Sequence, residues 1–385
     1  MEIILIGNYP PDNQQSMERF ASMLQSGFLD SGYHASIWRP IVLFGSMFSS
    51  TNTGTGKWMG YMDKWIVFPL ILLFCKKKTV RNKKISFHIC DHSNAPYLQF
   101  LPSDRTSITC HDVLAIRGAM GYADAYCKTS STGKIYQKWI LNHLSKAKKL
   151  AAVSQLTLTQ LIAIQKNPDL SKKNWKVIYN AFNADFKPMD KKDAFPLIQK
   201  YGIKPPYSFI LHVGSDQSRK NRKMLLDLAH ELGKNWEGQI CYAGQLPDQD
   251  LLNHSVALGL SDRLIAVPNP DHFTLMALYS TCKAFIFPSF SEGFGWPLIE
   301  AQACGAPVIA SKYHPMPEIS GGAALHADPT QPKEFAHAFR KLADQNFNDS
   351  LVQQGMINTR RFNKAEMIQN YLFLIGNKMG DLKTQ

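Results

Sequence analysis

The stretch of residues 291–301 combines two glycines, a proline and two carboxylates in a pattern that suits the binding of an anion. It follows an apolar run, residues 284–288, that is typical of a buried parallel strand, and it leads into a run that is typical of a short helix. Pro297 suits the first turn of that helix, and Gly293 and Gly295 allow the backbone to approach a ligand closely. Because the N–H groups and the dipole at a helix N-terminus favour negative charge, this stretch predicts a site for a diphosphate.

Two carboxylates frame the predicted anion site. Glu292 lies in the loop, and Glu300 follows eight positions later, which is about two turns of a helix. A carboxylate does not bind phosphate, whereas sugar hydroxyls are good hydrogen-bond donors to it. The pattern therefore indicates a site for a nucleotide sugar. The alternative is that both residues are solvated acids of a loop and a helix.

With its neighbours, this stretch is very similar to the signature of the retaining GT-B glycosyltransferases of family 4. In that signature a Glu, seven residues and a second Glu lie in an EGFG-x-P-x-x-EA context, as in residues 292–301, and the similarity continues through residues 305–310, 317–319 and 322–324. The resemblance covers residues 207–330 well and residues 1–180 loosely. It implies an α/β protein of GT-B fold, with two Rossmann-like α/β/α domains facing a central cleft.

The overall composition is that of an ordinary soluble globular protein, and the chain length indicates the number of domains. The chain has 385 residues, 45% of them hydrophobic and 19% charged, which favours two domains. Seven cysteines without a C-x-x-C pair argue against a disulfide framework or a zinc site and for a reducing compartment. The apolar start, residues 2–7, is typical of a first strand and lacks the basic start and cleavage site of a signal peptide.

The order of predicted elements places a domain boundary near residue 185. After the first strand, a helix from about residue 16 and a strand at 34–38 complete a β-α-β unit, and further strands are predicted at 85–91, 105–110, 150–154 and 177–180. A second series of strands follows at 207–214, 239–244, 263–268 and 284–288. We expect an N-terminal, acceptor-side domain over 1–185 and a C-terminal domain over 186–360 that binds the nucleotide sugar. A last helix, within 361–385, would cross back to the N-terminal domain, as the resemblance implies.

The region of residues 45–84 does not fit a simple Rossmann-like pattern. Residues 45–60 are rich in Ser, Thr and Gly and predict a loop, in which residues 54–57 only faintly echo a phosphate-binding loop. Residues 65–75 are eleven apolar residues, fewer than the about 20 that span a bilayer. Six Lys and Arg residues follow within residues 76–84. Residues 65–84 could contact an anionic membrane surface, or form a buried helix with a solvated basic end.

A pair of cations follows the first strand of the C-terminal domain. Arg219 and Lys220 precede a helix that we expect from about Arg222, and the resemblance assigns such a Lys to the donor diphosphate. Two fixed cations could neutralise a diphosphate leaving group without a metal ion, although both could also be simple surface charges. The resemblance also places the nucleobase near residues 266–269. The predicted donor-binding residues are Ser215, Arg219, Lys220, Val267, Gly293, Phe294, Gly295, Trp296, Leu298 and Glu300.

Polar residues also follow two predicted strands of the N-terminal domain. His111 and Asp112 come directly after the strand at 105–110, at the edge of a parallel sheet where ligands bind. The resemblance implies that this His faces the donor sugar, so the predicted catalytic residues are Glu292 and His111, although His111 could instead cap the next loop. On weaker grounds, Asp91, His92 and Asp112 are predicted to lie on the acceptor side.

These observations predict a retaining, metal-independent glycosyltransferase without a cofactor. It would move a hexose of mannose or glucose type from a UDP- or GDP-linked donor to a glycan or lipid-linked saccharide, in the cytoplasm or at the inner face of the membrane. The net charge of +13 permits a nucleic-acid partner, but no binding motif for one is present, and we expect none. Two alternatives stay open: an enzyme of the same fold that acts on nucleotide sugars without transfer, and a catalytically silent protein that binds nucleotide sugars or membranes.

Overall fold

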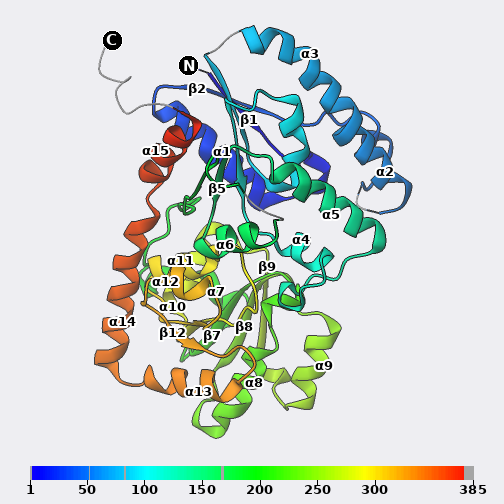
Figure 1. Ribbon diagram of the computed structural model, residues 1–385. Coiled ribbons are helices and arrows are strands. Elements are labelled where there is room, and N and C mark those ends of the chain that lie inside the picture. Colours follow the sequence, from blue (N-terminus) through cyan, green and yellow to red (C-terminus); the bar gives the residue numbers. More distant parts are fainter. Residues whose placement is uncertain (1, 52, 82–83, 166–168, 377–385) are drawn as a thin grey trace. The chain divides into compact units, whose positions relative to one another are not determined.

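The computed structural model describes residues 2–51, 53–81, 84–165 and 169–376, and for residues 76–81 it describes the backbone alone (Figure 1). The chain forms two compact units, which we describe separately. The first contains Met1–Gly121, Lys128–Asn183 and Lys364–Gln385, and the second contains Tyr122–Cys127 and Ala184–Asn363. The short segment Tyr122–Cys127 belongs to the second unit, a feature that the division from the sequence did not include.

The first unit contains a sheet of six parallel strands in the order β2-β1-β3-β4-β5-β6. Every residue of its two central strands, 85–89 and 106–110, is buried, including the polar ones, as expected for a parallel sheet covered by helices. The last strand lies three residues before the predicted position of 177–180. The strands are β1 (Glu2–Ile6), β2 (His34–Trp38), β3 (Ile85–Ile89), β4 (Thr106–Cys110), β5 (Lys149–Ala152) and β6 (Asn174–Val177).

The C-terminal helix packs into this first unit. Ile368 of α15 lies against Gly27 of α1, and Tyr371 Oη and Thr109 Oγ1 are hydrogen-bonded at 2.9 Å (Figure 1). Lys149 Nζ donates to the carbonyl of Ile375 at 2.7 Å. The helices of this unit are α1 (Gln15–Asp30), α2 (Gly54–Met62), α3 (Phe68–Arg81), α4 (Leu114–Ala119), α5 (Ser131–Leu144), α6 (Gln155–Ala163) and α15 (Lys364–Ile375).

The prediction of a loop over residues 45–60 is wrong from Gly54 onward. Helix α2 begins there and continues through a π-helical turn, Asp63–Val67, into α3. The glycines that suggested a loop are packing positions: a Cβ on Gly56 would lie 2.1 Å from the carbonyl oxygen of Ser50, and one on Gly60 would lie 3.1 Å from Thr51. They let the helix pack closely against the preceding segment, a tertiary contact that local composition does not reveal.

The second unit repeats the same architecture. Its six parallel strands have the order β12-β11-β10-β7-β8-β9, so β7 and β10 are neighbours at the centre of the sheet. The predicted strands 207–214, 239–244, 263–268 and 284–288 are confirmed within two residues. The strands are β7 (Phe209–Gly214), β8 (Gln239–Gly244), β9 (Leu264–Pro268), β10 (Ala284–Phe287), β11 (Val308–Ser311) and β12 (Leu325–Ala327).

The helices of the second unit cover a separate apolar core that includes Ile210, Leu228 and Ile286. The predicted helix after residue 296 is confirmed as α11, with Pro297 in its first turn. With one sheet and one core in each unit, the predicted pair of Rossmann-like domains is confirmed. The helices are α7 (Lys191–Gln199), α8 (Met224–Leu232), α9 (Gln249–Ala257), α10 (His272–Thr281), α11 (Trp296–Ala303), α12 (Met316–Ser320), α13 (Pro332–Lys341) and α14 (Gln345–Asn358).

Candidate active site

Two cations of the second unit converge on one carboxylate. Arg219 and Lys220 lie in the 3-10 turn Ser218–Lys220 after β7, and Glu292 lies in the loop between β10 and α11. Lys220 Nζ is 2.7 Å from Glu292 Oε1, and Arg219 Nη1 is 2.7 Å from Glu292 Oε2. Because β7 and β10 are adjacent parallel strands, their carboxyl ends bring these three side chains together.

This cluster carries a net positive charge in a buried setting. Burial alone would raise the pKa of Glu292, but the charges of Lys220 and Arg219 and their hydrogen bonds lower it to about 2. Burial lowers the pKa of Lys220, while the charge of Glu292 opposes that change. With Glu292 ionised and both cations charged, one positive charge is left over. The cluster is therefore electrostatically suited to an anion.

Hydrogen bonds to backbone carbonyls connect the turn after β7 to the loop after β10. The N–H of Phe290 donates to the carbonyl of Arg219 at 2.8 Å, and Arg219 Nη1 donates to the carbonyl of Ser291 at 2.9 Å. Asn221 adopts a φ of 51° and donates through Nδ2 to the carbonyls of Pro288 and Pro329 at 3.3 and 2.7 Å. Asn221 was not among the predicted site residues, because its role depends on partners far away in the sequence.

The glycine loop before α11 approaches β10 closely. Gly295 has a φ of 100°, and a Cβ at this position would lie 3.2 Å from Cε1 of Phe287. The ammonium of Lys220 lies 5.5 Å from the centre of the same Phe287 ring. Gly295 therefore places the N-terminus of α11 beside the cation cluster, in a backbone conformation that L-residues avoid.

Several other predicted donor residues support this loop from inside the unit. Phe294 is buried, and its ring meets those of Trp296 and Phe362 edge-on, at 6.1 and 5.6 Å. The side chain of Leu298 is fully buried, and its N–H donates to the carbonyl of Gly295 at 3.0 Å. Gly293, before them, is partly exposed. The structure thus places Phe294 and Leu298 as packing residues of the loop.

The remaining predicted donor residues lie on three different elements. Glu300 is buried in α11, where its Oε2 accepts a hydrogen bond from Tyr279 Oη of α10 at 3.1 Å. Val267 of β9 is fully buried, so the structure gives it no exposed atom that could contact a base. Ser215 is partly exposed directly after β7. Tyr279 was missed in the sequence, because nothing near it indicates that its hydroxyl reaches Glu300.

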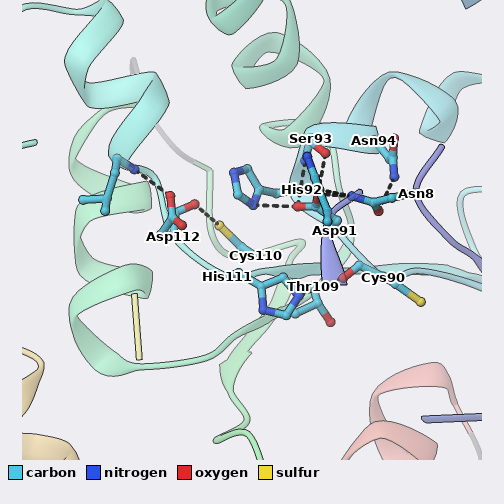
Figure 2. A network of polar contacts seen from close by, with 12 residues as sticks. Asn8, Cys90, Asp91, His92, Ser93, Asn94, Thr109, Cys110, His111 and Asp112 are labelled. Carbon is cyan, nitrogen blue, oxygen red and sulfur yellow. Dashed lines mark hydrogen bonds and ion pairs between the residues drawn. The ribbon is translucent and has the colours of Figure 1, made fainter. Parts of the chain in front are cut away.

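A second polar group gathers in the first unit, where β1, β3 and β4 end (Figure 2). Asp91 Oδ2 accepts from Asn8 Nδ2 at 2.8 Å, and Asp91 Oδ1 lies 3.2 Å from His92 Nδ1. The hydroxyl of Ser93 also donates to Asp91, and Asn94 Nδ2 donates to Asn8 Oδ1 at 2.9 Å. Asp91 is therefore the centre of a buried network that includes Asn8, which sequence reasoning missed because β1 carries no motif at its end.

The two histidines near this network have opposite pKa shifts. Burial lowers the pKa of His92, but the hydrogen bond and charge of Asp91 outweigh this and raise it above 6.5. Burial would likewise raise the pKa of Asp91, and His92 instead lowers it well below its usual range. For His111, burial dominates and lowers the pKa below 6.5. Asp91 and His92 therefore stabilise each other's charged forms, whereas His111 is neutral at pH 7.

His111 has a defined tautomer in its buried position. Its Nε2 donates to the carbonyl of Cys90 at 2.9 Å, and its ring meets Phe20 edge-on at 4.6 Å (Figure 2). The neutral ring therefore keeps a lone pair on Nδ1, which can accept a hydrogen bond. Asp112 Oδ1 accepts from the N–H of Leu114 at 2.9 Å and caps the turn into α4. This hydrogen bond stabilises the turn, so the structure shows a structural role for Asp112.

The predicted site residues form two groups, one in each unit. The first unit brings together Asp91, His92, His111 and Asp112, and the second unit brings together Arg219, Lys220, Glu292 and Gly295. Across residues 2–51, 53–81, 84–165 and 169–376, no group of three or more His, Cys, Asp and Glu side chains is placed to hold a metal ion.

Comparisons with known proteins agree with this architecture. Residues 193–357 match the model of the family described as glycosyl transferases group 1. O-antigen chain mannosyltransferase B of Escherichia coli is 27% identical over 241 residues, which are 59% of this chain and 60% of that relative. The serotype-specific mannosyltransferase WbdA of Escherichia coli is 26% identical over 288 residues, which are 71% of this chain but 34% of that relative.

Solved structures show the fold over the whole chain. Sucrose-phosphate synthase of Thermosynechococcus elongatus superimposes with a TM-score of 0.71 at 18% identity, covering 97% of this chain and 98% of that one. HepE of Anabaena, solved in complex with UDP and glucose, gives a TM-score of 0.71 at 14% identity and covers 98% and 100%. The predicted GT-B fold is confirmed. The match to the family model supports a glycosyltransferase, and the chain spans less than two thirds of the length of the two mannosyltransferases named above.

Proposed function

We propose that this protein is a retaining glycosyltransferase of family 4 that transfers mannose from a nucleoside-diphosphate sugar to a glycan or lipid-linked saccharide. The observation that carries the proposal is the buried cluster of Lys220, Arg219 and Glu292 beside the N-terminus of α11. Its excess positive charge matches a diphosphate, which carries negative charge before the reaction and gains more as it leaves.

The cations would act on the leaving group. When the bond between the anomeric carbon and the donor phosphate breaks, its electron pair stays on the phosphate oxygen, close to Lys220 and Arg219. The acceptor oxygen forms the new bond to the anomeric carbon on the same face, and its proton passes to that phosphate oxygen. In this scheme fixed cations stabilise the diphosphate without a metal ion, and no separate protein base is required.

The other predicted residues would position the donor and acceptor. Glu300, held by Tyr279, is proposed to accept hydrogen bonds from the ribose, and Glu292 is proposed to contact the transferred sugar. In the first unit, His111 remains a proposed catalytic residue. The lone pair on Nδ1 of neutral His111 suits a sugar hydroxyl. Asp91 and His92 are proposed to bind the acceptor, because a carboxylate beside an imidazole offers both an acceptor and a donor of hydrogen bonds.

The known activities in the names of the two relatives support the proposed sugar and the proposed biosynthetic process. The two relatives described above are named mannosyltransferases, one of them for the O-antigen chain. We therefore favour mannose over glucose as the transferred sugar, with polysaccharide synthesis as the process. As the carrier nucleotide we propose GDP. Such a reaction would use cytoplasmic nucleotide sugars and would take place in the cytoplasm, at the inner face of the membrane.

Donor binding is the first test. We would measure the thermal unfolding midpoint of the full chain with GDP, UDP, ADP, GDP-mannose and UDP-glucose. A ligand at 100 times its dissociation constant should add about 2.7 kcal/mol to the free energy of unfolding. We expect GDP and GDP-mannose to stabilise the parent, and to stabilise Lys220→Ala and Glu300→Ala much less.

The matched control is Lys223→Ala, which removes an exposed lysine that pairs with Asp250 instead of Glu292. This variant should keep the full donor response. If no nucleotide raises the midpoint of the parent, the proposed function is wrong. If donor binding is seen, the anomeric configuration of the product, measured by NMR, decides retention, and an inverted product would contradict that part of the proposal.

A further inference from the structure

The helical stretch from α2 to α3 exposes a row of large apolar side chains. Ile66, Leu70, Leu73 and Phe74 are between 42% and 77% exposed, and Trp58 is 61% exposed. Ile66, Leu70 and Phe74 follow at intervals of four residues, so they share one face of the helix. The opposite face is also apolar, because Phe68 and Leu72 are buried in the core of the first unit. An outward face of an ordinary surface helix would be polar.

A buried carboxylate attaches a second apolar segment to this helix. Asp63, in the π-helical turn, is fully buried and accepts hydrogen bonds from the N–H groups of Leu43, Phe44 and Gly45 at 3.1, 2.9 and 2.9 Å. Tyr9 Oη donates to the same carboxylate at 2.7 Å. The segment held in this way carries further exposed apolar side chains, namely Ile41, Leu43 and Met47, which are between 54% and 70% exposed.

Basic residues far outnumber acids in the part of the sequence that carries these apolar side chains. Residues 41–90 contain eight Lys and Arg residues and a single acid, Asp63, whose carboxylate is buried. Lys57 and Lys84 are exposed at the two ends of the stretch, and the sequence of α3 continues after Cys75 with three lysines. Exposed apolar side chains next to an excess of positive charge match the headgroup and acyl boundary of an anionic bilayer.

The stretch is suited to lie on a membrane and not to cross it. Gly54–Cys75 is 22 residues long and contains an 18-residue window with a mean hydropathy of 1.3, which is enough by length and composition to span a bilayer. Its inner face, however, is fixed in the first unit: Tyr97 Oη donates to the carbonyl of Lys64 at 2.9 Å, and Trp65 meets Trp139 edge-on at 4.8 Å. Spanning would expose the Asp63 carboxylate and its network to hydrocarbon.

We propose that the apolar face formed by Trp58, Ile66, Leu70, Leu73 and Phe74, with the segment that Asp63 holds, docks on an anionic lipid surface. The apolar side chains enter the interface and the lysines contact the headgroups. Lipid binding requires neither donor nor catalysis. Docking would also bring the protein to a lipid-linked acceptor. This consequence rests on the proposed function.

The test is flotation of the full chain with vesicles, without any nucleotide. We expect binding to vesicles of phosphatidylcholine mixed with phosphatidylglycerol, weakened by salt, and little binding to phosphatidylcholine alone. The variant Ile66→Ser/Leu70→Ser/Phe74→Ser should lower the partition coefficient at least about tenfold, because each side chain loses its burial in the interface. Lys76→Glu/Lys77→Glu/Lys78→Glu should remove the preference for phosphatidylglycerol.

Two controls keep the result specific. Val256→Ser/Phe273→Ser removes exposed apolar side chains from the second unit and should leave flotation unchanged. Lys220→Ala should float like the parent, so a failure of the donor site and a failure of lipid docking are separable. Circular dichroism checks that each variant is folded.

Three results would overturn the inference. They are no binding to either vesicle, equal binding by the triple serine variant, and equal loss in the control from the second unit. Self-association of the parent in sedimentation velocity, without vesicle binding, would assign the apolar face to a second copy of the chain and would also contradict lipid docking.

Discussion

The ammonium of Lys220 lies 2.7 Å from Oε1 of Glu292, although 72 residues separate the two in the sequence. Both residues were predicted to bind a donor, one at the diphosphate and the other at the sugar. The structure adds that the two side chains form an ion pair with each other. The carboxylate therefore also fixes the direction of the cation that would meet the diphosphate.

The pairing of Glu292 predicts a specific loss of stability in acid. Its pKa is about 2 in the folded protein and 4.5 in an unperturbed chain, so its contribution to stability is complete above pH 4.5 and is lost as the pH falls toward 2. The contribution is on the order of 3 kcal/mol. Urea unfolding should show that Glu292→Gln is less stable than the parent at pH 7, and that the difference shrinks below pH 4.5. A difference that is constant with pH would contradict the ion pair.

The pKa values of the two histidines near Asp91 should lie on opposite sides of 6.5. NMR of the ring carbons should give a pKa above 6.5 for His92 and below 6.5 for His111. His92 then contributes stability that is complete below pH 6.5 and is lost as the pH rises through its folded pKa. Asp91→Asn should bring the pKa of His92 below 6.5, since burial then opposes only the charge of Asp112, and Asp112→Asn should change it much less. Equal pKa values for the two histidines would count against the network.

Substitution of Gly295 should damage the donor loop. Gly295→Ala places a Cβ 3.2 Å from Phe287 Cε1 in a backbone with a φ of 100°, and we expect a loss of about 1–3 kcal/mol in the free energy of unfolding. Gly322→Ala is the matched control, because its φ is 79° but no atom lies within 4 Å of the new Cβ. Thermal unfolding with GDP should show that only Gly295→Ala loses the donor response. A normal response in that variant would exclude a close approach of this loop to the diphosphate.

The hydroxyl of Tyr279 should affect donor affinity through Glu300. Tyr279→Phe removes the hydrogen bond at 3.1 Å, which we expect to cost about 0.5–1.5 kcal/mol of stability and to weaken nucleotide binding several-fold. Tyr242→Phe removes a buried hydrogen bond of similar length, 3.0 Å to the carbonyl of Arg222, and should lower stability without changing affinity. Calorimetric titration with GDP distinguishes the two. Equal affinities would show that Glu300 does not need Tyr279 to bind the ribose.

The strand, glycine loop and helix around Glu292 could be predicted from the sequence alone. Their signals are local: an apolar run for β10, Gly295 where φ is positive, and Pro297 in the first turn of α11. The two series of strands gave the Rossmann-like domains for the same reason. By contrast, Gly56 and Gly60 look like loop residues in the sequence but are helical in the structure. A glycine is needed at these positions because the helix lies close to residues 50 and 51.

Only the tertiary structure determined which side chains meet. Local patterns identified Lys220, Arg219 and Glu292 separately, but their ion pairs depend on the adjacency of β7 and β10 in the sheet. The same holds for Asp63, which looks like one acid in an apolar stretch until the fold brings the N–H groups of residues 43–45 to its carboxylate. The sequence by itself determined the elements and the residue types of the candidate site, because these follow from local conformation and periodicity. The charges, partners and exposed faces were decided by the fold, because they arise from contacts between residues that lie far apart in the chain.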